Sequence, residues 1–116
     1  MRQLYKTIKI GGITIPIYWD DEEEGMQEGC LGYSEFCAEN VEIALNPCLQ
    51  NKPELLETTL YHEIFHQISA IFNLDFSEAM VSVLAVAMVD VLVSLNDEVV
   101  VETKKIRRPR KNKKSV

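Results

Sequence analysis

The chain has 116 residues, of which 47% are hydrophobic, and its net charge is −6 at pH 7. This length accommodates one hydrophobic core and not two, and the composition is that of a globular domain. Three cysteines without a C-x-x-C pair exclude a regular disulfide framework and predict a reducing, cytoplasmic location.

The first two predicted strands lie within KTIKIGGITIPIYW. Gly11 and Gly12 separate two β-rich segments, and glycine can adopt the positive φ that a tight hairpin turn requires. Pro16 lacks an amide hydrogen, so we expect the second strand to be an edge or bulged there. The opening MRQLYKTIKI lacks the apolar region of a signal peptide. The acidic segment DDEEEGMQEG that follows is predicted to be a solvated loop.

Two further strands are predicted in LGYSEFC and VEIAL, on either side of a short turn. In the second of them the apolar and less apolar residues alternate, in the order Val41, Glu42, Ile43, Ala44 and Leu45. This period of two is typical of a strand with one buried face.

The second half of the chain predicts two helices. Asn51 as the cap and Glu54 three residues later indicate a first helix from about Pro53 to Phe72. A second helix is expected from Asp75 to about Leu95, and its apolar residues on nearly every side predict that it crosses the core. Its apolar run is shorter than the roughly 20 residues of a membrane span, so we expect no membrane partner. EVVVE near residues 98–102 suggests a last short strand.

The charge is concentrated at the C-terminal end. Residues 104–116 hold eight of the 12 basic side chains, whereas all 18 acidic ones lie in residues 1–103. Such a run of like charge cannot bury enough apolar surface to fold, so we expect a disordered basic tail. It either contacts nucleic acid or another acidic partner, or it only keeps the chain soluble.

The segment TTLYHEIFHQIS contains the only two histidines, His62 and His66, in an H-E-x-x-H pattern. Residues four apart lie on one face of a helix, so both imidazoles can reach one Zn²⁺ ion. Glu63 is rotated by about 100° around the helix and can take a proton from zinc-bound water. The alternative interpretation is a polar strip on an amphipathic surface helix.

A catalytic zinc site needs a third protein ligand. Glu78 is the first candidate, because it lies in the first turn of the second predicted helix, twelve residues after His66. A helix–turn–helix connection would bring that turn back toward the histidines. Asp75 and Asp90 are the reserve candidates. Glu78 can also be explained without a metal, as the fourth residue of an Asp75-x-x-Glu78 capping box.

TLYHEIFHQIS followed by SEAMVSVLAVAM resembles the helix pair of small zincin-like metallopeptidases of the ImmA/IrrE and minimal gluzincin types, often carried by phages or prophages. IKIGGITIPI and LGYSEFCAENVEIAL resemble their opening hairpin and strand pair, so the likeness spans roughly residues 6–95. The resemblance implies zinc ligation by His62, His66 and Glu78, with Glu63 as the base. It also implies that the strand from Val41 to Leu45 pairs with an extended substrate.

The chain departs from this family in two respects. The family's E-x-x-A-x-x-F-A pattern after the zinc motif is matched only loosely, and no further histidine is present to stabilise an oxyanion. We expect Tyr33 and Tyr61 to be packing residues, and a hydrogen bond to the oxyanion from either of them is the alternative.

These features predict an α+β protein with a zincin-like fold over residues 1–103, in which a three- or four-stranded sheet packs on two helices. The predicted function is a zinc-dependent endopeptidase that cleaves a protein or peptide with zinc-bound water activated by Glu63. One alternative is a catalytically inactive zinc-binding module, of phage or regulatory type, that acts by contact with protein or nucleic acid. Another is a structural or regulatory phage protein without a metal.

Overall fold

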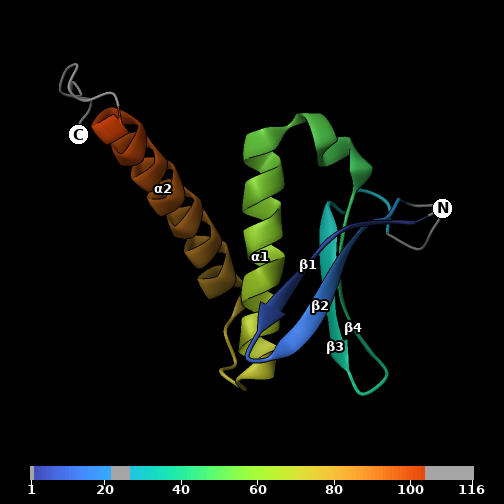
Figure 1. Ribbon diagram of the computed structural model, residues 1–116. Coiled ribbons are helices and arrows are strands. Elements are labelled where there is room, and N and C mark those ends of the chain that lie inside the picture. Colours follow the sequence, from blue (N-terminus) through green and yellow to red (C-terminus); the bar gives the residue numbers. More distant parts are fainter. Residues whose placement is uncertain (1, 22–26, 104–116) are drawn as a thin grey trace.

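The computed structural model describes residues 2–21 and 27–103, which form one four-stranded mixed sheet and two long helices (Figure 1). The elements in chain order are β1 (Gln3–Ile10), β2 (Ile13–Trp19), β3 (Gly32–Cys37), β4 (Asn40–Leu45), the short 3₁₀ helix η2 (Pro47–Asn51), α1 (Pro53–Ile71) and α2 (Glu78–Thr103). The predicted α+β class is therefore confirmed.

The predicted hairpin is β1 and β2, which pair antiparallel around Gly11 and Gly12. Both glycines have positive φ, 57° and 83°, a conformation that other residues rarely adopt. Pro16 pairs with Thr7 of β1, but β2 joins its other neighbour only from Ile17 onward. At Pro16 the strand is thus an edge on one side, which explains how the sheet tolerates the missing donor.

The sheet order is β1-β2-β4-β3, so β4 lies in the interior of the sheet. β4 pairs antiparallel with β3 along its whole length and parallel with β2 from Ile43 to Leu45. The two edges are β1 and β3. This order is not evident from the chain, because β3 and β4 look like an equivalent pair of short strands.

Helix α1 covers one face of the sheet, and the core lies between them (Figure 1). The buried side chains come from β2, β4 and η2 and are Ile15, Ile17, Trp19, Ile43, Leu45 and Leu49. Leu56, Leu60 and Ile64 of α1 pack against this cluster. Asn51 is the last residue of η2 and does not cap α1, whose N-cap is Lys52 without a side-chain bond. Pro53 starts α1 instead, because its fixed φ suits the first turn.

Helix α2 differs from its prediction at both ends. Asp75 has φ of 61° and stands outside the helix, and Ser77 caps it by accepting a hydrogen bond from the Met80 amide at 3.1 Å. Residues 98–102 belong to α2, so the predicted last strand is wrong. Helical order simply continues, since no glycine or proline lies between Glu78 and Thr103.

The prediction that α2 crosses the core is also wrong. Only 11% of the segment Glu78–Asn96 is buried, with Val81 and Ala85 as its buried residues. By length and apolar composition alone, this segment could cross a membrane. A core helix would bury most of its side chains, so α2 presents an apolar surface that the described part of the chain leaves exposed.

The sheet face away from α1 carries a polar cluster. The guanidinium of Arg2 contacts Asp20 at 2.9 Å and Glu42 at 3.0 Å, and both carboxylates are buried, with exposed fractions of 0% and 5%. The Tyr33 hydroxyl lies 3.2 Å from Asp20 and 3.1 Å from Glu42. Arg2 also stacks over the ring of Tyr18 at 4.1 Å. Through this cluster Arg2, which directly precedes β1, is bonded to Glu42 in the interior strand β4.

Candidate metal centre

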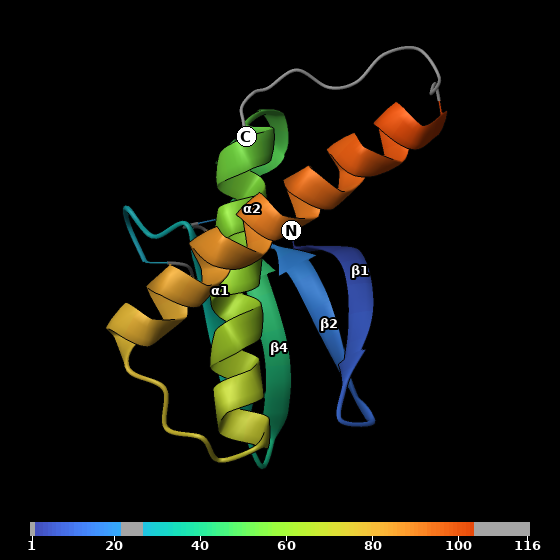
Figure 2. The same cartoon turned by 90° about the vertical axis from the view of Figure 1, so that its left-hand side faces the viewer.

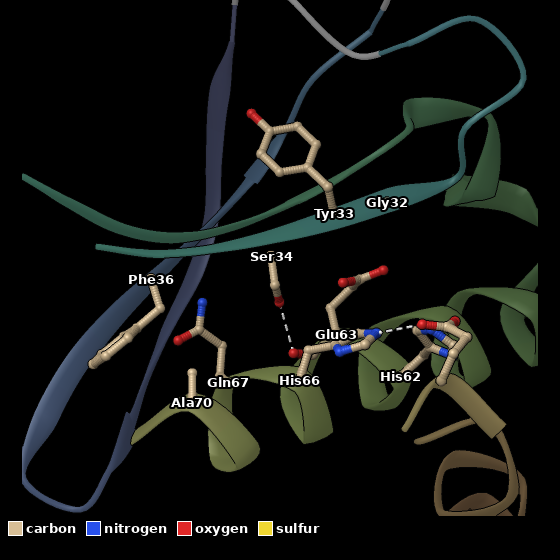
Figure 3. Close-up of a pocket in the computed structure, with 10 residues that line it drawn as sticks. Gly32, Tyr33, Ser34, Phe36, His62, Glu63, His66, Gln67 and Ala70 are labelled. Carbon is tan, nitrogen blue, oxygen red and sulfur yellow. Dashed lines mark hydrogen bonds and ion pairs between the residues drawn. The ribbon is translucent and has the colours of Figure 1, made fainter. Parts of the chain in front are cut away.

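The imidazoles of His62 and His66 converge on the Glu78 carboxylate (Figure 3). Nε2 of His62 lies 2.7 Å from one Glu78 oxygen, and Nε2 of His66 lies 3.1 Å from the other. One ligand atom from each residue falls within 4.8 Å of the others, so the three side chains can hold a metal ion. The structure therefore brings together the three side chains that the sequence predicts as metal ligands.

Two local features create this convergence. His62 and His66 are one helical turn apart on α1, and their ring centroids are 4.9 Å apart. Glu78 is the first residue of α2, and the connection between the helices is fixed where the Phe76 amide donates to Ser69 Oγ at 2.8 Å. Because Ser77 is the cap, Glu78 does not occupy the capping-box position, and its carboxylate is turned to the histidines.

Glu63 lies apart from the trio. Its side chain is buried, with an exposed fraction of 7%, and it points from α1 toward β3 (Figure 3). Burial raises the pKa of the Glu63 carboxyl above its ordinary value of 4.5, while nearby His66 acts in the opposite direction. Ser34 of β3 donates to the Glu63 carbonyl at 2.8 Å and fixes this turn of α1 against the strand. Glu63 is thus a carboxylate positioned next to the trio with a raised proton affinity.

A cleft with a volume of about 550 Å³ opens beside the trio and Glu63. Its walls are β3 and the middle of α1, with Glu78 at one end, and its lining residues are Gly32, Tyr33, Ser34, Phe36, His62, Glu63, His66, Gln67, Ala70 and Glu78. A Cβ at Gly32 would lie 3.1 Å from the Thr59 side chain, so glycine allows β3 to approach α1 this closely.

The predicted substrate strand, Val41 to Leu45, is not at this cleft. Ile43, Ala44 and Leu45 are flanked by β2 and β3, so no peptide can pair with them. Glu42 is held in the polar cluster with Arg2 on the other face of the sheet. The prediction fails because it treated the strand nearest in sequence to α1 as the edge strand, whereas β3 is the edge.

The open edge of β3 runs along the cleft. The Asn46 amide donates to the Leu31 carbonyl at 2.8 Å, so Leu31 and Asn46 form a hydrogen-bonded pair at the end of the β3–β4 ladder. Hydrogen-bonded and non-hydrogen-bonded pairs alternate in an antiparallel ladder. Gly32, Ser34 and Phe36 therefore direct their N–H and C=O groups away from β4 and toward the open edge.

Sequence reasoning missed Gln67, and the structure excludes the alternative role of Tyr33 as an oxyanion donor. The Gln67 amide is fully buried and donates to the carbonyls of Glu35 and Glu42 at 2.9 and 3.1 Å, which joins α1 to both strands. Its Oε1 has no hydrogen-bond partner in the described part of the chain. The Tyr33 side chain points away from the trio (Figure 3), so it cannot serve an oxyanion there. The role proposed for Tyr61 stays a prediction.

The remaining candidates do not join the trio. Within the described residues, the group of side chains that could hold a metal ion contains Glu78 and neither Asp75 nor Asp90. Asp90 instead lines a separate hollow between the two helices. The basic tail, residues 104–116, lies outside the described residues, and its partners stay a prediction.

We compared the chain with known protein families, curated proteins and solved structures. No protein-family model, no curated protein and no solved structure matches the chain.

Proposed function

We propose that the protein is a zinc-dependent endopeptidase with a zincin-like active site. The observation that carries the proposal is the convergence of two imidazoles and one carboxylate beside a second, separately buried carboxylate. Two nitrogens and one oxygen are the donor set of many catalytic zinc sites. Ligands at zinc-bond length in a tetrahedron lie about 3.3 Å apart. The two distances from the imidazoles to the Glu78 carboxylate, 2.7 and 3.1 Å, are close to this, and the three ligand atoms all lie within 4.8 Å of one another.

In this proposal Glu63 is the proton carrier. His62, His66 and Glu78 would hold the zinc ion, which when bound would supply Lewis-acid activation of water near neutral pH. The Glu63 carboxylate accepts the proton of that water and can hand it to the leaving amine.

The substrate is an extended peptide that lies along β3. The outward N–H groups of Gly32, Ser34 and Phe36 and the C=O groups of Ser34 and Phe36 supply backbone hydrogen bonds of the kind used in β-augmentation. The Gly32 carbonyl already accepts a hydrogen bond from Cys30 Sγ at 3.0 Å. Phe36, which is 41% exposed, offers an apolar contact for one side chain of the peptide. Backbone pairing recognises extended peptides of many sequences, whereas folded regions cannot enter the cleft in this way.

The third ligand can be tested by substitution. Glu78→Ala should weaken zinc binding by at least the roughly 10- to 100-fold that loss of an outer-shell partner already causes. Asp75→Ala and Asp90→Ala are the matched controls, because neither carboxylate joins the trio. Isothermal titration with zinc measures all three. Unchanged affinity in Glu78→Ala would assign the third position to another group.

Peptide hydrolysis is tested with an unbiased mixture. Zinc-loaded protein is incubated with a proteome-derived peptide library, and new peptide termini are identified by mass spectrometry. We expect internal cleavage that stops when zinc is removed by a chelator and returns when it is restored. Stoichiometric zinc binding without any new termini would contradict the peptidase and leave a metal-binding module that acts by contact.

A further inference from the structure

Helix α1 buries three polar side chains in a single stripe. Its buried residues are Thr59, Glu63 and Gln67, with exposed fractions of 9%, 7% and 0%. Each follows the previous one by four residues, so all three lie on one side of the helix. A helix that covers a sheet normally buries an apolar stripe, and α1 also packs apolar side chains against the core. This polar stripe is therefore a second contact surface of α1.

The polar stripe faces the edge strand β3. A Cβ at Gly32 would lie 3.1 Å from the Thr59 side chain, so strand and helix are in close contact there. The next contact is the hydrogen bond from Ser34 Oγ to the Glu63 carbonyl, at 2.8 Å. Between the two contacts α1 advances by four residues, about 6 Å, and β3 by two residues, about 6.6 Å. The two repeats nearly match, so helix and strand run side by side along the cleft (Figure 3).

Gln67 makes the third contact of the stripe. Its Nε2 donates to the Glu35 carbonyl at 2.9 Å and to the Glu42 carbonyl at 3.1 Å. Glu35 and Glu42 are partners in the β3–β4 ladder, so one amide group fixes α1 against both strands. Hydrogen bonds are directional, whereas apolar contacts are not. The polar stripe therefore fixes the spacing and the register of β3 relative to α1.

The opposite face of β3 is held at the same place. The Tyr33 hydroxyl lies 3.2 Å from the Asp20 carboxylate and 3.1 Å from that of Glu42. Side chains of successive strand residues point to opposite faces of a sheet, so Tyr33 and Ser34 hold β3 from both sides. This edge strand has a neighbouring strand on one side only, and these contacts fix it beside the cleft.

We propose that the polar stripe sets the distance between the trio and a peptide paired with β3, and that Ser34 and Gln67 are positioning residues for that peptide. His62 and His66 each directly precede a member of the stripe and are rotated from it by about 100°. A shift of α1 along β3 would therefore move both imidazoles relative to the outward backbone groups of β3. A misplacement of about 1 Å can slow a reaction about a hundredfold. The inference rests on the proposed peptidase function, because the peptide is its substrate.

Ser34→Ala tests the proposal, because it removes the hydroxyl and keeps the backbone of β3. For a peptide that the zinc-loaded parent cleaves, we expect kcat/KM to fall about ten- to a hundredfold, with a rise in KM. Ser34→Thr keeps the hydroxyl and should restore the KM of the parent. Thr58→Ala is the matched control, since the Thr58 hydroxyl donates to the Glu54 carbonyl at 3.0 Å and lies outside the cleft. Zinc affinity should be unchanged in all three variants.

Amide hydrogen exchange tests the spacing without a substrate. Gln67→Met keeps the length of the side chain but cannot donate a hydrogen bond. In the zinc-free protein, we expect the Tyr33 and Glu35 amides of β3 to exchange at least about tenfold faster than in the parent, because two hydrogen bonds are lost. The amides of the β1–β2 hairpin should keep their exchange rates.

Two kinds of result would overturn the proposal. One is a KM in Ser34→Ala equal to that of the parent, with kcat lowered only in proportion to the folded fraction. The other is exchange in Gln67→Met that is unchanged in β3, or that accelerates equally in the β1–β2 hairpin, which would show a general loss of stability. Either result leaves the peptidase standing. A parent that cleaves no library peptide would instead overturn the proposed function, and the exchange rates would still decide whether the polar stripe fixes β3.

Discussion

Glu63→Gln is expected to lower kcat/KM for peptide hydrolysis by about 10²- to 10⁴-fold, the range by which a positioned general base contributes. Glutamine keeps the size of the side chain but cannot accept and return a proton. Zinc content should stay the same, because Glu63 is not one of the three converging side chains. Cleavage of a peptide identified from the library, followed at saturating zinc, measures the effect.

The matched control for this variant is Glu57→Gln, an exposed glutamate on the same helix. It should retain full activity. The thermal stability of Glu63→Gln should be equal to or above that of the parent, because burial disfavours the charged carboxylate that the variant removes. Full turnover in Glu63→Gln would place the base elsewhere, whereas loss of zinc would make Glu63 a ligand.

The second large effect is expected far from the cleft, at Arg2. Arg2→Ala leaves Asp20 and Glu42 buried on the sheet without their cation. Breaking a buried pair costs about 3–5 kcal/mol, and we expect about 2–4 kcal/mol here because the Arg2 side chain is itself 37% exposed. The melting temperature should fall by roughly 10 °C. Calorimetry of the zinc-free protein measures it without a contribution from the metal.

The pH dependence of stability gives this prediction a second readout. Burial acts to raise the pKa of Glu42, but the hydrogen bonds from Arg2, Asn40 and Tyr33 and the positive charge of Arg2 together outweigh it, and the pKa is lowered from its ordinary 4.5. A lowered pKa adds stability above 4.5 that disappears as the pH falls through the folded-state value. Arg2→Ala should lose this acid-side slope below the ordinary pKa of 4.5. An unchanged slope would show that Arg2 does not control the carboxylate.

A neutralised variant separates charge from packing at the same place. When Arg2→Met is combined with Asp20→Asn and Glu42→Gln, no charge is left buried, and most of the lost stability should return. If the triple variant is as unstable as Arg2→Ala, the role of the cluster is steric, through contacts such as the stacking of Arg2 on Tyr18.

Much of the local structure was predictable from the chain. Gly11-Gly12 specifies the hairpin by the φ values it permits, and the spacing of His62 and His66 specifies their common face on α1. The ends of α2 were not predictable in the same way. Ser77 and Asp75 are both good caps, and only the path of the connection, through Ser69, decides between them.

Long-range placement was the part that the sequence could not supply. The order of strands depends on which pairs bury the most apolar surface, so Val41–Leu45 could not be recognised as interior to the sheet. Arg2 carries no local signal, because its partners Asp20 and Glu42 are distant in the chain. The sequence of an apolar helix is the same whether the helix is buried in its own core or exposed. The prediction that α2 crosses the core was therefore wrong.

The division of the three candidate metal ligands between two helices has a thermodynamic consequence. Two ligands belong to α1, which is tied into the core, whereas Glu78 belongs to α2, which is attached mainly through Val81 and Ala85. The third ligand is available only in molecules whose α2 is docked, so the apparent affinity for the ion is the intrinsic affinity multiplied by the docked fraction. Ion uptake and helix docking therefore form one coupled equilibrium, and each strengthens the other by the same factor.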